Sequence, residues 1–408
     1  MSGARIAEPV LVVLAGARGH GRWHLNNLRR LADAGRVTLA GVCELTPLEG
    51  PELDGFGADG RGGAVAQGDD LGALLDATGA RVAVICTPIQ THTELALVAA
   101  RRGVHLLLEK PPAPSYTEYE RMVRGVTEAG IACQIGFQSL GSHAMSHIRD
   151  LVRDGHIGDP LGIGAAGAWV RDEAYFRRAP WAGHRRLPDP TGSGTGPIDV
   201  VDGVLTNPLA HAVSTALALS GATGGDDLAA VRTELFRAHA IEADDTSFVE
   251  ITPRDGVRVT VAATLCAEHA AEPYVVVHGS RGRITFWYKQ DRVLVQRAGH
   301  GPEETVLGRT DLLENLLDHL TSGAGLLVPP VATGAFMRVV EEVRRAPDPR
   351  ALPADAWTSV PGAGEGAAPR RVVHGIDGLV AASADSLTGY AGLGARWARP
   401  RSGLEAAS

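Results

Sequence analysis

The N-terminal part of the chain alternates short apolar runs with amphipathic segments. Residues 10–16, VLVVLAG, are continuously apolar, which is typical of a parallel strand buried on both faces. The next segment carries Leu25, Leu28 and Leu31 on one helical stripe. The alternation continues, and further strands are expected at 37–44, 82–88, 104–110 and 131–137. Repeated strand–helix units of this length predict an α/β fold with a doubly wound parallel sheet.

The pattern changes from about residue 136 onward. Long β-like runs are broken by the turn sequences TPRDG and GSRG, which predicts antiparallel pairing. Residues 346–408 begin with a connector rich in Pro, Ala and Gly and continue into an amphipathic piece, so we expect a docking tail anchored by Ile376 and Trp397. The expected organisation is an N-terminal domain at 1–135, a second α+β domain at 136–345 and this tail.

Charge and cysteine usage exclude several classes of function. The 408-residue chain has a formal net charge of −8 and no basic run, which argues against a nucleic-acid or anionic-membrane surface. Its four cysteines are far apart with no C-x-x-C, which favours buried strand thiols in a reducing compartment. No segment approaches the roughly 20 apolar residues that span a bilayer. We therefore expect a cytoplasmic protein without nucleic-acid or membrane partners.

The turn after the first strand resembles a phosphate-binding loop. Gly16 can supply the tight turn, and Gly21 lets the following helix approach the strand. The helix N-terminus would present amides and a positive dipole end to a pyrophosphate. Arg18 replaces the usual middle glycine, so either its guanidinium contacts the phosphates or the loop is displaced. The expected cofactor-binding residues of this turn are Gly16, Arg18, Gly19, His20 and Gly21.

An acidic residue follows the second predicted strand. Glu44 lies 23 residues beyond Gly21, where a carboxylate can accept hydrogen bonds from an adenosine ribose. The same carboxylate would repel a 2′-phosphate, which favours NAD over NADP as the cofactor. The alternative is a solvated turn residue before Pro47.

Lysine is rare in this chain, and its position is informative. Lys110 and Lys289 are the only lysines among 39 basic residues. An ammonium group can be shifted by burial to exchange a proton near neutral pH, whereas a guanidinium effectively cannot. Lys110 ends the strand predicted at 104–110, and ligands bind beyond the carboxyl ends of parallel strands. The alternative is a neutral surface lysine at a strand end.

Four segments together resemble the Gfo/Idh/MocA family, named for glucose–fructose oxidoreductase and inositol dehydrogenase. They are AGARGHGRWHLNNL, GVCE, CTPIQTHTELALVAARRGVHLLLEKPPA and TNPLAHAVSTAL, and the similarity runs from about residue 10 to about 345. The resemblance implies an N-terminal Rossmann domain that binds NAD(P). It also implies a C-terminal domain with an open, mainly antiparallel sheet.

The resemblance also implies roles for residues of the E-K-P element. Lys110 matches the family lysine between nicotinamide and substrate, and Glu109 and Pro111 match its neighbours, with a cis Lys–Pro bond expected. Thr87 and Pro88 match the segment lining the nicotinamide ribose. His92 matches the histidine that opens the following helix.

Family members also carry Asp-x-x-x-His on a helix of the second domain. Asn207 and His211 occupy these positions, four residues apart and thus expected on one helical face. His211 is the expected general base, with a packed core histidine as the alternative. A neutral amide cannot raise the pKa of His211 as a carboxylate would. If that carboxylate was indispensable, the reaction has changed or been lost.

A loop rich in Arg, Tyr and Trp precedes this helix. Aromatic faces pack on sugar C–H groups and guanidinium groups bind hydroxyls, so Arg171, Tyr175 and Trp181 are expected substrate contacts. The alternative, an RNA-binding patch, conflicts with the acidic net charge of the protein. Asp202 could bind substrate hydroxyls or form a turn.

Two histidine pairs have the helical i, i+4 spacing of metal ligands, His20/His24 and His143/His147. No nearby carboxylate or cysteine is expected to complete either set, so we expect no metal site.

These features predict an NAD-dependent oxidoreductase that moves hydride between nicotinamide and a hydroxyl-bearing carbon of a sugar, cyclitol or related polyol. Lys110 and His211 would manage the hydroxyl proton, and Asn207 would orient one of them. One alternative is a redox-neutral glycosidase or dehydratase that acts by transient C3 oxidation. Another is a non-catalytic dinucleotide sensor. The resemblance suggests a homodimer or homotetramer.

Overall fold

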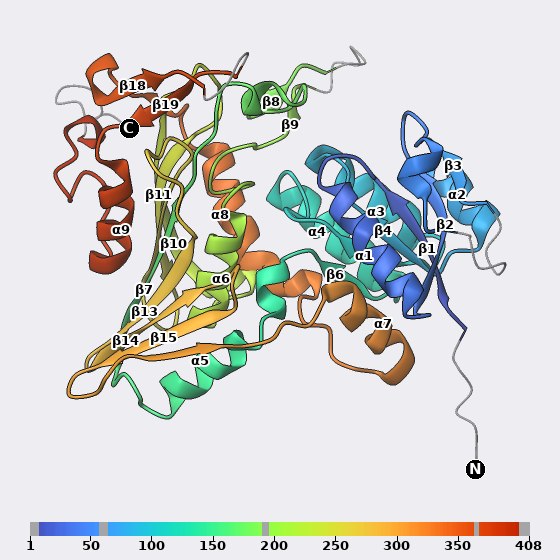
Figure 1. Cartoon of the computed structure of the whole chain (residues 1–408), viewed down its shortest axis with the longest axis horizontal. Coiled ribbons are helices and arrows are strands. Elements are labelled where there is room, and N and C mark those ends of the chain that lie inside the picture. Colours follow the sequence, from blue (N-terminus) through green and yellow to red (C-terminus); the bar gives the residue numbers. More distant parts are fainter. Residues whose placement is uncertain (1–7, 57–63, 190–195, 363–366, 400–408) are drawn as a thin grey trace. The chain divides into compact units, whose positions relative to one another are not determined.

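A computed structural model describes residues 8–56, 64–189, 196–362 and 367–399 (Figure 1). The chain forms two compact units. The first contains residues 1–137 together with 310–331, and the second contains 138–309 together with 332–408. No described helix is long and apolar enough to cross a membrane.

The first unit contains a six-stranded sheet with the strand order β3-β2-β1-β4-β5-β6, in which every pairing is parallel. Its strands are β1 (Val10–Ala15), β2 (Val37–Cys43), β3 (Ala66–Gly68), β4 (Val82–Ile85), β5 (His105–Leu108) and β6 (Cys133–Ile135). Its helices are α1 (Gly21–Asp33), α2 (Leu71–Thr78), α3 (His92–Ala100), α4 (Tyr116–Glu128) and α7 (Leu312–Ser322). This strand order is that of a Rossmann fold and confirms the predicted fold class. Neither β3 nor α2 was among the elements expected from the sequence.

The segment 310–331 returns to the first unit, so the expectation of one continuous domain at 136–345 was wrong. Gln134 of β6 accepts a hydrogen bond from the amide of Val328 (2.8 Å), and its own amide group donates to Asn315 of α7. Ile135 donates to the carbonyl of Val328 (2.9 Å). These bonds join residues nearly 200 positions apart, so local sequence patterns do not reveal them.

The second unit is built on a nine-stranded sheet with the order β16-β15-β14-β13-β7-β12-β11-β10-β17. Only the β7–β12 and β10–β17 pairs are parallel, which confirms a mainly antiparallel sheet. The strands are β7 (Pro160–Ala168), β10 (Leu228–Arg237), β11 (Thr246–Pro253), β12 (Val259–Thr264), β13 (Tyr274–Gly279), β14 (Gly282–Trp287), β15 (Arg292–Arg297), β16 (Glu303–Val306) and β17 (Arg350–Ala351). Shorter two-stranded sheets pair β8 (Arg186–Leu187) with β9 (Ile198–Asp199), and β18 (Trp357–Val360) with β19 (Arg370–Val373).

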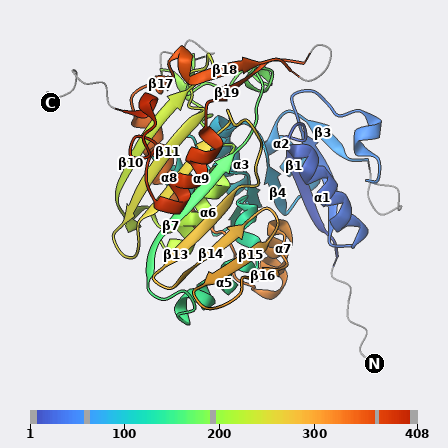
Figure 2. The same ribbon diagram turned by 60° about the vertical axis from the view of Figure 1, so that its left-hand side comes forward.

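Helices cover both faces of this sheet. Helices α6 (Ala210–Ser220) and α8 (Gly334–Arg345) lie on one face and α9 (Ile376–Ser386) on the other, with α5 (Ala144–Arg153) near one end of the sheet (Figures 1 and 2). Gly164 of β7 allows the close approach of α9, because a Cβ there would lie 2.0 Å from the carbonyl oxygen of Ala384.

The C-terminal segment is an integral layer of the second unit. Ile376 is 1% exposed, and the ring of Trp397 packs edge-on against Phe236 at 4.8 Å between centroids. The hydroxyl of Tyr390 donates to the carbonyls of Ser247 and Ala263 of the sheet. Residues 346–362 and 367–399 therefore pack against the sheet, and the anchors expected from the sequence, Ile376 and Trp397, both lie in this contact.

Candidate functional site

The turn between β1 and α1 requires glycine at two positions. Gly16 has a φ of +82°, and a Cβ there would lie 2.5 Å from the carbonyl oxygen of Cys86. A Cβ on Gly21 would lie 2.0 Å from the carbonyl oxygen of Gly16. Both are contacts with rigid backbone, so a larger residue would displace the loop or the helix. Gly19 also has a positive φ, +58°, but its Cβ position is open.

Glu44 closes this loop from the end of β2. Its Oε1 accepts hydrogen bonds from the amides of Ala17 (2.5 Å) and Arg18 (3.0 Å). Among the described residues, no group donates to its other oxygen, Oε2. Glu44 is therefore tied to the loop, which argues against the alternative of a solvated turn residue.

The Arg18 side chain lies along the segment after β2. Its guanidinium donates to the carbonyls of Thr46 (2.7 Å) and Pro47 (3.2 Å). The amides of Gly19 and His20, at the start of α1, find no acceptor within the described part of the chain. Two unpaired amides at a helix N-terminus suit an anion such as a pyrophosphate. The glycines, these amides and Glu44 fit a bound dinucleotide, with Arg18 holding the loop.

Lys110 follows β5 in a turn that buried histidines support. The Lys110–Pro111 bond is cis, as expected from the resemblance. His92, 1% exposed, lies with Nδ1 2.8 Å from the Pro111 carbonyl and Nε2 2.8 Å from the Thr87 carbonyl. His92 thus links the segments that follow β4 and β5. Burial lowers the pKa of His92, and the two carbonyls oppose that shift.

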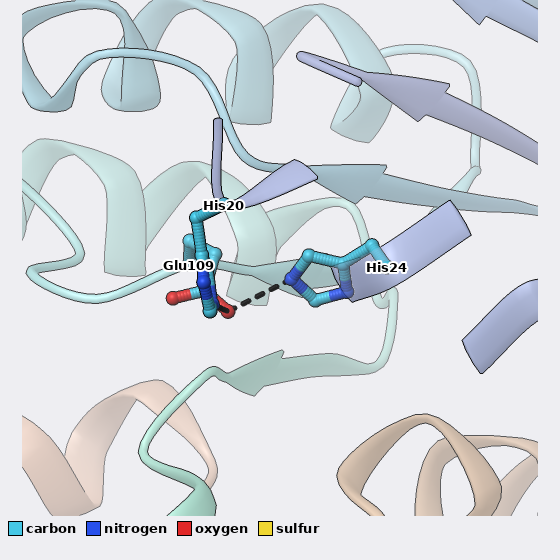
Figure 3. Close-up of side chains that lie close together, drawn as sticks. All are labelled: His20, His24 and Glu109. Carbon is cyan, nitrogen blue, oxygen red and sulfur yellow. Dashed lines mark hydrogen bonds and ion pairs between the residues drawn. The ribbon is translucent and has the colours of Figure 1, made fainter. Parts of the chain in front are cut away.

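Glu109 forms the centre of a cluster with two histidines (Figure 3). Its Oε1 lies 2.9 Å from Nε2 of His24 and 3.6 Å from Nε2 of His20, and its Oε2 accepts from the amide of Lys110 (3.1 Å). Burial raises the pKa of Glu109, but hydrogen bonds from His20 and His24 outweigh it and hold the pKa well below its usual value. Glu109 thus joins the His20/His24 pair, so the expectation that no nearby carboxylate completes this set was wrong.

Asn207 lies in the turn before α6, so the expectation that it shares a helical face with His211 was wrong. Its Nδ2 donates to Oδ1 of Asp202 at 2.7 Å. Asp202 is 5% exposed and also accepts from the amide of Gly183 (2.8 Å). Burial raises the pKa of Asp202, and the nearby Arg178 guanidinium opposes that rise. A carboxylate is thus present one hydrogen bond away from Asn207.

His211 lies in the first turn of α6. Its Nδ1 is 3.2 Å from the hydroxyl of Ser139, which also accepts a hydrogen bond from Thr215 (2.9 Å). A hydroxyl oxygen has two acceptor lone pairs. Ser139 can therefore accept from Nδ1–H of His211 as well, in the tautomer that leaves Nε2 unprotonated.

The structure brings the expected substrate-binding residues together around Arg178, which the sequence analysis did not select as a site residue. The guanidinium of Arg178 lies 3.8 Å from the ring centroid of Tyr175 and 4.6 Å from that of Trp181. It also pairs with Asp202 at 3.1 Å. Arg171 stacks on the same Tyr175 ring at 4.9 Å. Alternating cations and aromatic rings are mutually stabilising, so these side chains form one continuous surface.

Comparisons with known proteins agree with this geometry. A sequence model described as "Oxidoreductase family, NAD-binding Rossmann fold" matches residues 10–137. The chain is 25% identical over 234 residues to levoglucosan dehydrogenase of Pseudarthrobacter phenanthrenivorans, covering 54% of this chain and 59% of that protein. It is 26% identical over 219 residues to 2,7-anhydro-N-acetylneuraminate hydratase of Mediterraneibacter gnavus, covering 53% of each. The alignments thus span little more than half of these curated relatives.

Solved structures show the same fold over most of the chain. The WlbA dehydrogenase from Bordetella pertussis, solved with NADH and UDP-GlcNAcA, matches with a TM-score of 0.64 and 19% identity over 83% of this chain and 96% of that one. The aldose-aldose oxidoreductase from Caulobacter crescentus matches with a TM-score of 0.65 and 17% identity over 83% and 97%. Residues 10–137 therefore match the Gfo/Idh/MocA model of NAD-binding oxidoreductases, and most of the chain shares the fold of these solved structures.

Proposed function

We propose that the protein is an NAD-dependent oxidoreductase that transfers hydride between nicotinamide and a hydroxyl-bearing carbon of a sugar, cyclitol or related polyol. The observation that carries the proposal is the Glu109–Lys110–Pro111 turn, which places an ammonium group at the carboxyl end of β5. The glycine turn at the end of β1 supports a dinucleotide at the same sheet edge. Relatives named levoglucosan dehydrogenase and inositol 2-dehydrogenase act on compounds of this kind.

In this mechanism the side chains of the protein manage one proton. Bound nicotinamide supplies or accepts the hydride. Lys110 donates a hydrogen bond to the reacting hydroxyl and stabilises the negative charge that develops on its oxygen. His211 takes the hydroxyl proton on Nε2, which requires its Nδ1–H to point at Ser139. Hydride then leaves the carbinol carbon as the C=O bond forms.

Asp202 provides a carboxylate one hydrogen bond away from Asn207, the position at which the resembled family has Asp. The Asn207 amide nitrogen donates to Asp202, so this buried carboxylate fixes the orientation of the Asn207 side chain. The buried Asp202 also holds the Arg178 guanidinium against Tyr175. Polyol hydroxyls and ring faces would be bound by this polar and aromatic surface.

NAD is the proposed form of the cofactor. The free Oε2 of Glu44 can accept hydrogen bonds from a ribose 2′-hydroxyl, and its charge would repel a 2′-phosphate. A fluorescence titration should give tighter binding of NAD⁺ than of NADP⁺. The homo-oligomeric state and the cytoplasmic location expected from the sequence remain predictions.

Replacing Lys110 with Met tests the proposed role of the ammonium group. Turnover on a panel of polyols and sugars should fall by about 100-fold or more, whereas NAD⁺ affinity should change little. Lys289→Met is the matched control for loss of a lysine charge, because Lys289 lies in the turn between β14 and β15 and pairs with Glu272 at 3.0 Å. Unchanged turnover in Lys110→Met would remove this lysine from the mechanism.

Redox-neutral chemistry is a second candidate, because two relatives are named hydratases and Asn207 departs from the family pattern. The absorbance of reduced nicotinamide separates the two. A dehydrogenase accumulates NADH with substrate, whereas a redox-neutral enzyme converts its substrate without net accumulation. A non-catalytic sensor would bind NAD⁺ and convert no compound of the panel.

A further inference from the structure

We propose that His20, His24 and Glu109 form a binding site for one divalent transition-metal ion of the zinc class. The two histidines lie one turn apart at the start of α1, and Glu109 follows β5 (Figure 3). All three belong to the first unit. The inference concerns the protein without cofactor or substrate and does not depend on the proposed enzymatic activity.

The distances suit a tetrahedral ion. One ligand atom from each residue lies within 4.8 Å of the other two. Oε1 of Glu109 is 2.9 Å from Nε2 of His24 and 3.6 Å from Nε2 of His20. Zinc–ligand bonds of about 2.0–2.1 Å in tetrahedral geometry separate neighbouring ligand atoms by about 3.3 Å. The two observed distances lie on either side of that value, and the third, between the two imidazole nitrogens, is at most 4.8 Å, so a shift of the exposed His20 side chain would complete the site.

The ligand chemistry selects the class of ion. Two imidazole nitrogens and one carboxylate oxygen are a common zinc set, and the two histidines have the i, i+4 spacing that directs both rings to one face of a helix. Magnesium and calcium require mostly oxygen ligands and fit poorly. Three protein ligands leave a fourth position for water or another small ligand.

Two of the three side chains are buried, and the third is exposed to solvent. His24 and Glu109 are 0% and 4% exposed, so their side chains are already held in place. The His20 side chain is 58% exposed, which leaves the cluster accessible from solvent. The backbone amide of Lys110 donates a hydrogen bond to Oε2 of Glu109. This bond orients the carboxylate so that Oε1 faces both imidazole rings.

A second three-residue group lacks such access. His239, Asp245 and Cys266 in the second unit also lie within ligand distance of one another. All three are at most 3% exposed, and Nδ1 of His239 is already bonded to Asp245 at 2.9 Å. Burial raises the pKa of the Cys266 thiol, which disfavours the thiolate that metals bind. The cluster at Glu109 is therefore the better site.

The test is isothermal titration calorimetry. Zinc chloride is titrated into the full-length chain, from which metals have been removed with a chelator, in the absence of NAD⁺. We expect one zinc ion per chain in the wild-type protein. His20→Ala should weaken binding by about tenfold or more, because it removes one of three ligands. This residue is exposed, so its replacement should leave the fold intact. Glu109→Gln, checked for folding by circular dichroism, should abolish the stoichiometric binding.

His143→Ala is the matched control. Like His20, His143 is an exposed residue at the N-terminus of a helix with a second histidine four positions later. Among the described residues it joins no three-ligand group, so zinc binding should be unchanged in this variant. The proposal is refuted if the wild-type protein binds no stoichiometric zinc, or if His20→Ala and the wild type bind it equally well. Either result leaves the proposed dehydrogenase activity to be judged by the Lys110→Met experiment alone.

Discussion

Replacing Asn207 with Asp would restore the carboxylate of the family pattern and place it against a second, buried carboxylate. Nδ2 of Asn207 now lies 2.7 Å from Oδ1 of Asp202, which is 5% exposed. In Asn207→Asp this hydrogen bond becomes a contact between two acceptors. The two carboxylates cannot both ionise at that distance, so the pair should share one proton in the folded state.

The cost of ionising both groups can be worked from the distance. After relaxation to about 4 Å, two like charges repel by about 4 kcal/mol at an effective dielectric constant of 20. The Arg178 guanidinium, 3.1 Å from Asp202, offsets part of this repulsion. We therefore expect Asn207→Asp to lower the stability of the second unit by about 2–3 kcal/mol at pH 8.

The sign of the pH dependence follows from proton binding. The folded pair would hold a proton that the unfolded chain releases near the ordinary carboxylate pKa, so the pKa of the pair is raised in the fold. Stability relative to the wild type is then retained at low pH and lost as the pH rises through the raised pKa. Thermal unfolding followed by circular dichroism at pH 5 and pH 8 should show a larger loss of Tm at pH 8.

Asn207→Ala separates repulsion from the loss of the hydrogen bond. It removes the donor without adding charge, so its loss of about 1–3 kcal/mol should vary little between the two pH values. If Asn207→Asp melts at the wild-type temperature at pH 8, the two side chains do not face one another as described. The electrostatic role proposed for Asp202 would then be incorrect.

Two further predictions concern the first unit. Gly21→Ala should abolish NAD⁺ binding, measured by fluorescence titration, because its Cβ would lie 2.0 Å from a backbone carbonyl oxygen. In Gly19→Ala the Cβ meets open space, so this variant should lose only about 1 kcal/mol of stability through its positive φ. Equal NAD⁺ affinity in the two variants would contradict this. His24→Leu should destabilise the unit by about 3–5 kcal/mol, because it leaves the buried Glu109 charge without its nearest partner. In the fold the pKa of Glu109 lies below its ordinary value of 4.5, so this carboxylate stabilises the unit above pH 4.5 and the stabilisation is lost as the pH falls through the folded pKa. Tm measured from pH 7 to pH 3 should therefore fall less steeply in His24→Leu than in the wild type. An equal fall of Tm in both proteins would refute the role of His24 as the partner of Glu109.

The amino-acid pattern by itself determined the class of fold and one edge of the site. Continuous apolar runs indicated parallel strands buried on both faces, and the observed sheet has them. Because parallel strands end at a common edge, the sequence could place Gly16, Glu44 and Lys110 at one rim. One local signal was missed. Pro208 disfavours helical geometry at the preceding residue, and α6 accordingly begins after Asn207, at Ala210.

Tertiary structure alone decided which side chains meet. Glu109 joins His24 from 85 positions away, and the segment 310–331 returns to β6 through bonds that span most of the chain. Arg178 contacts Asp202 across 24 residues. Periodicity reports only which face of an element is buried, over a few residues. The partner across a strand end or a loop depends on how the chain returns in space, so the Glu109 cluster and the Asp202 network could be found only in the folded molecule.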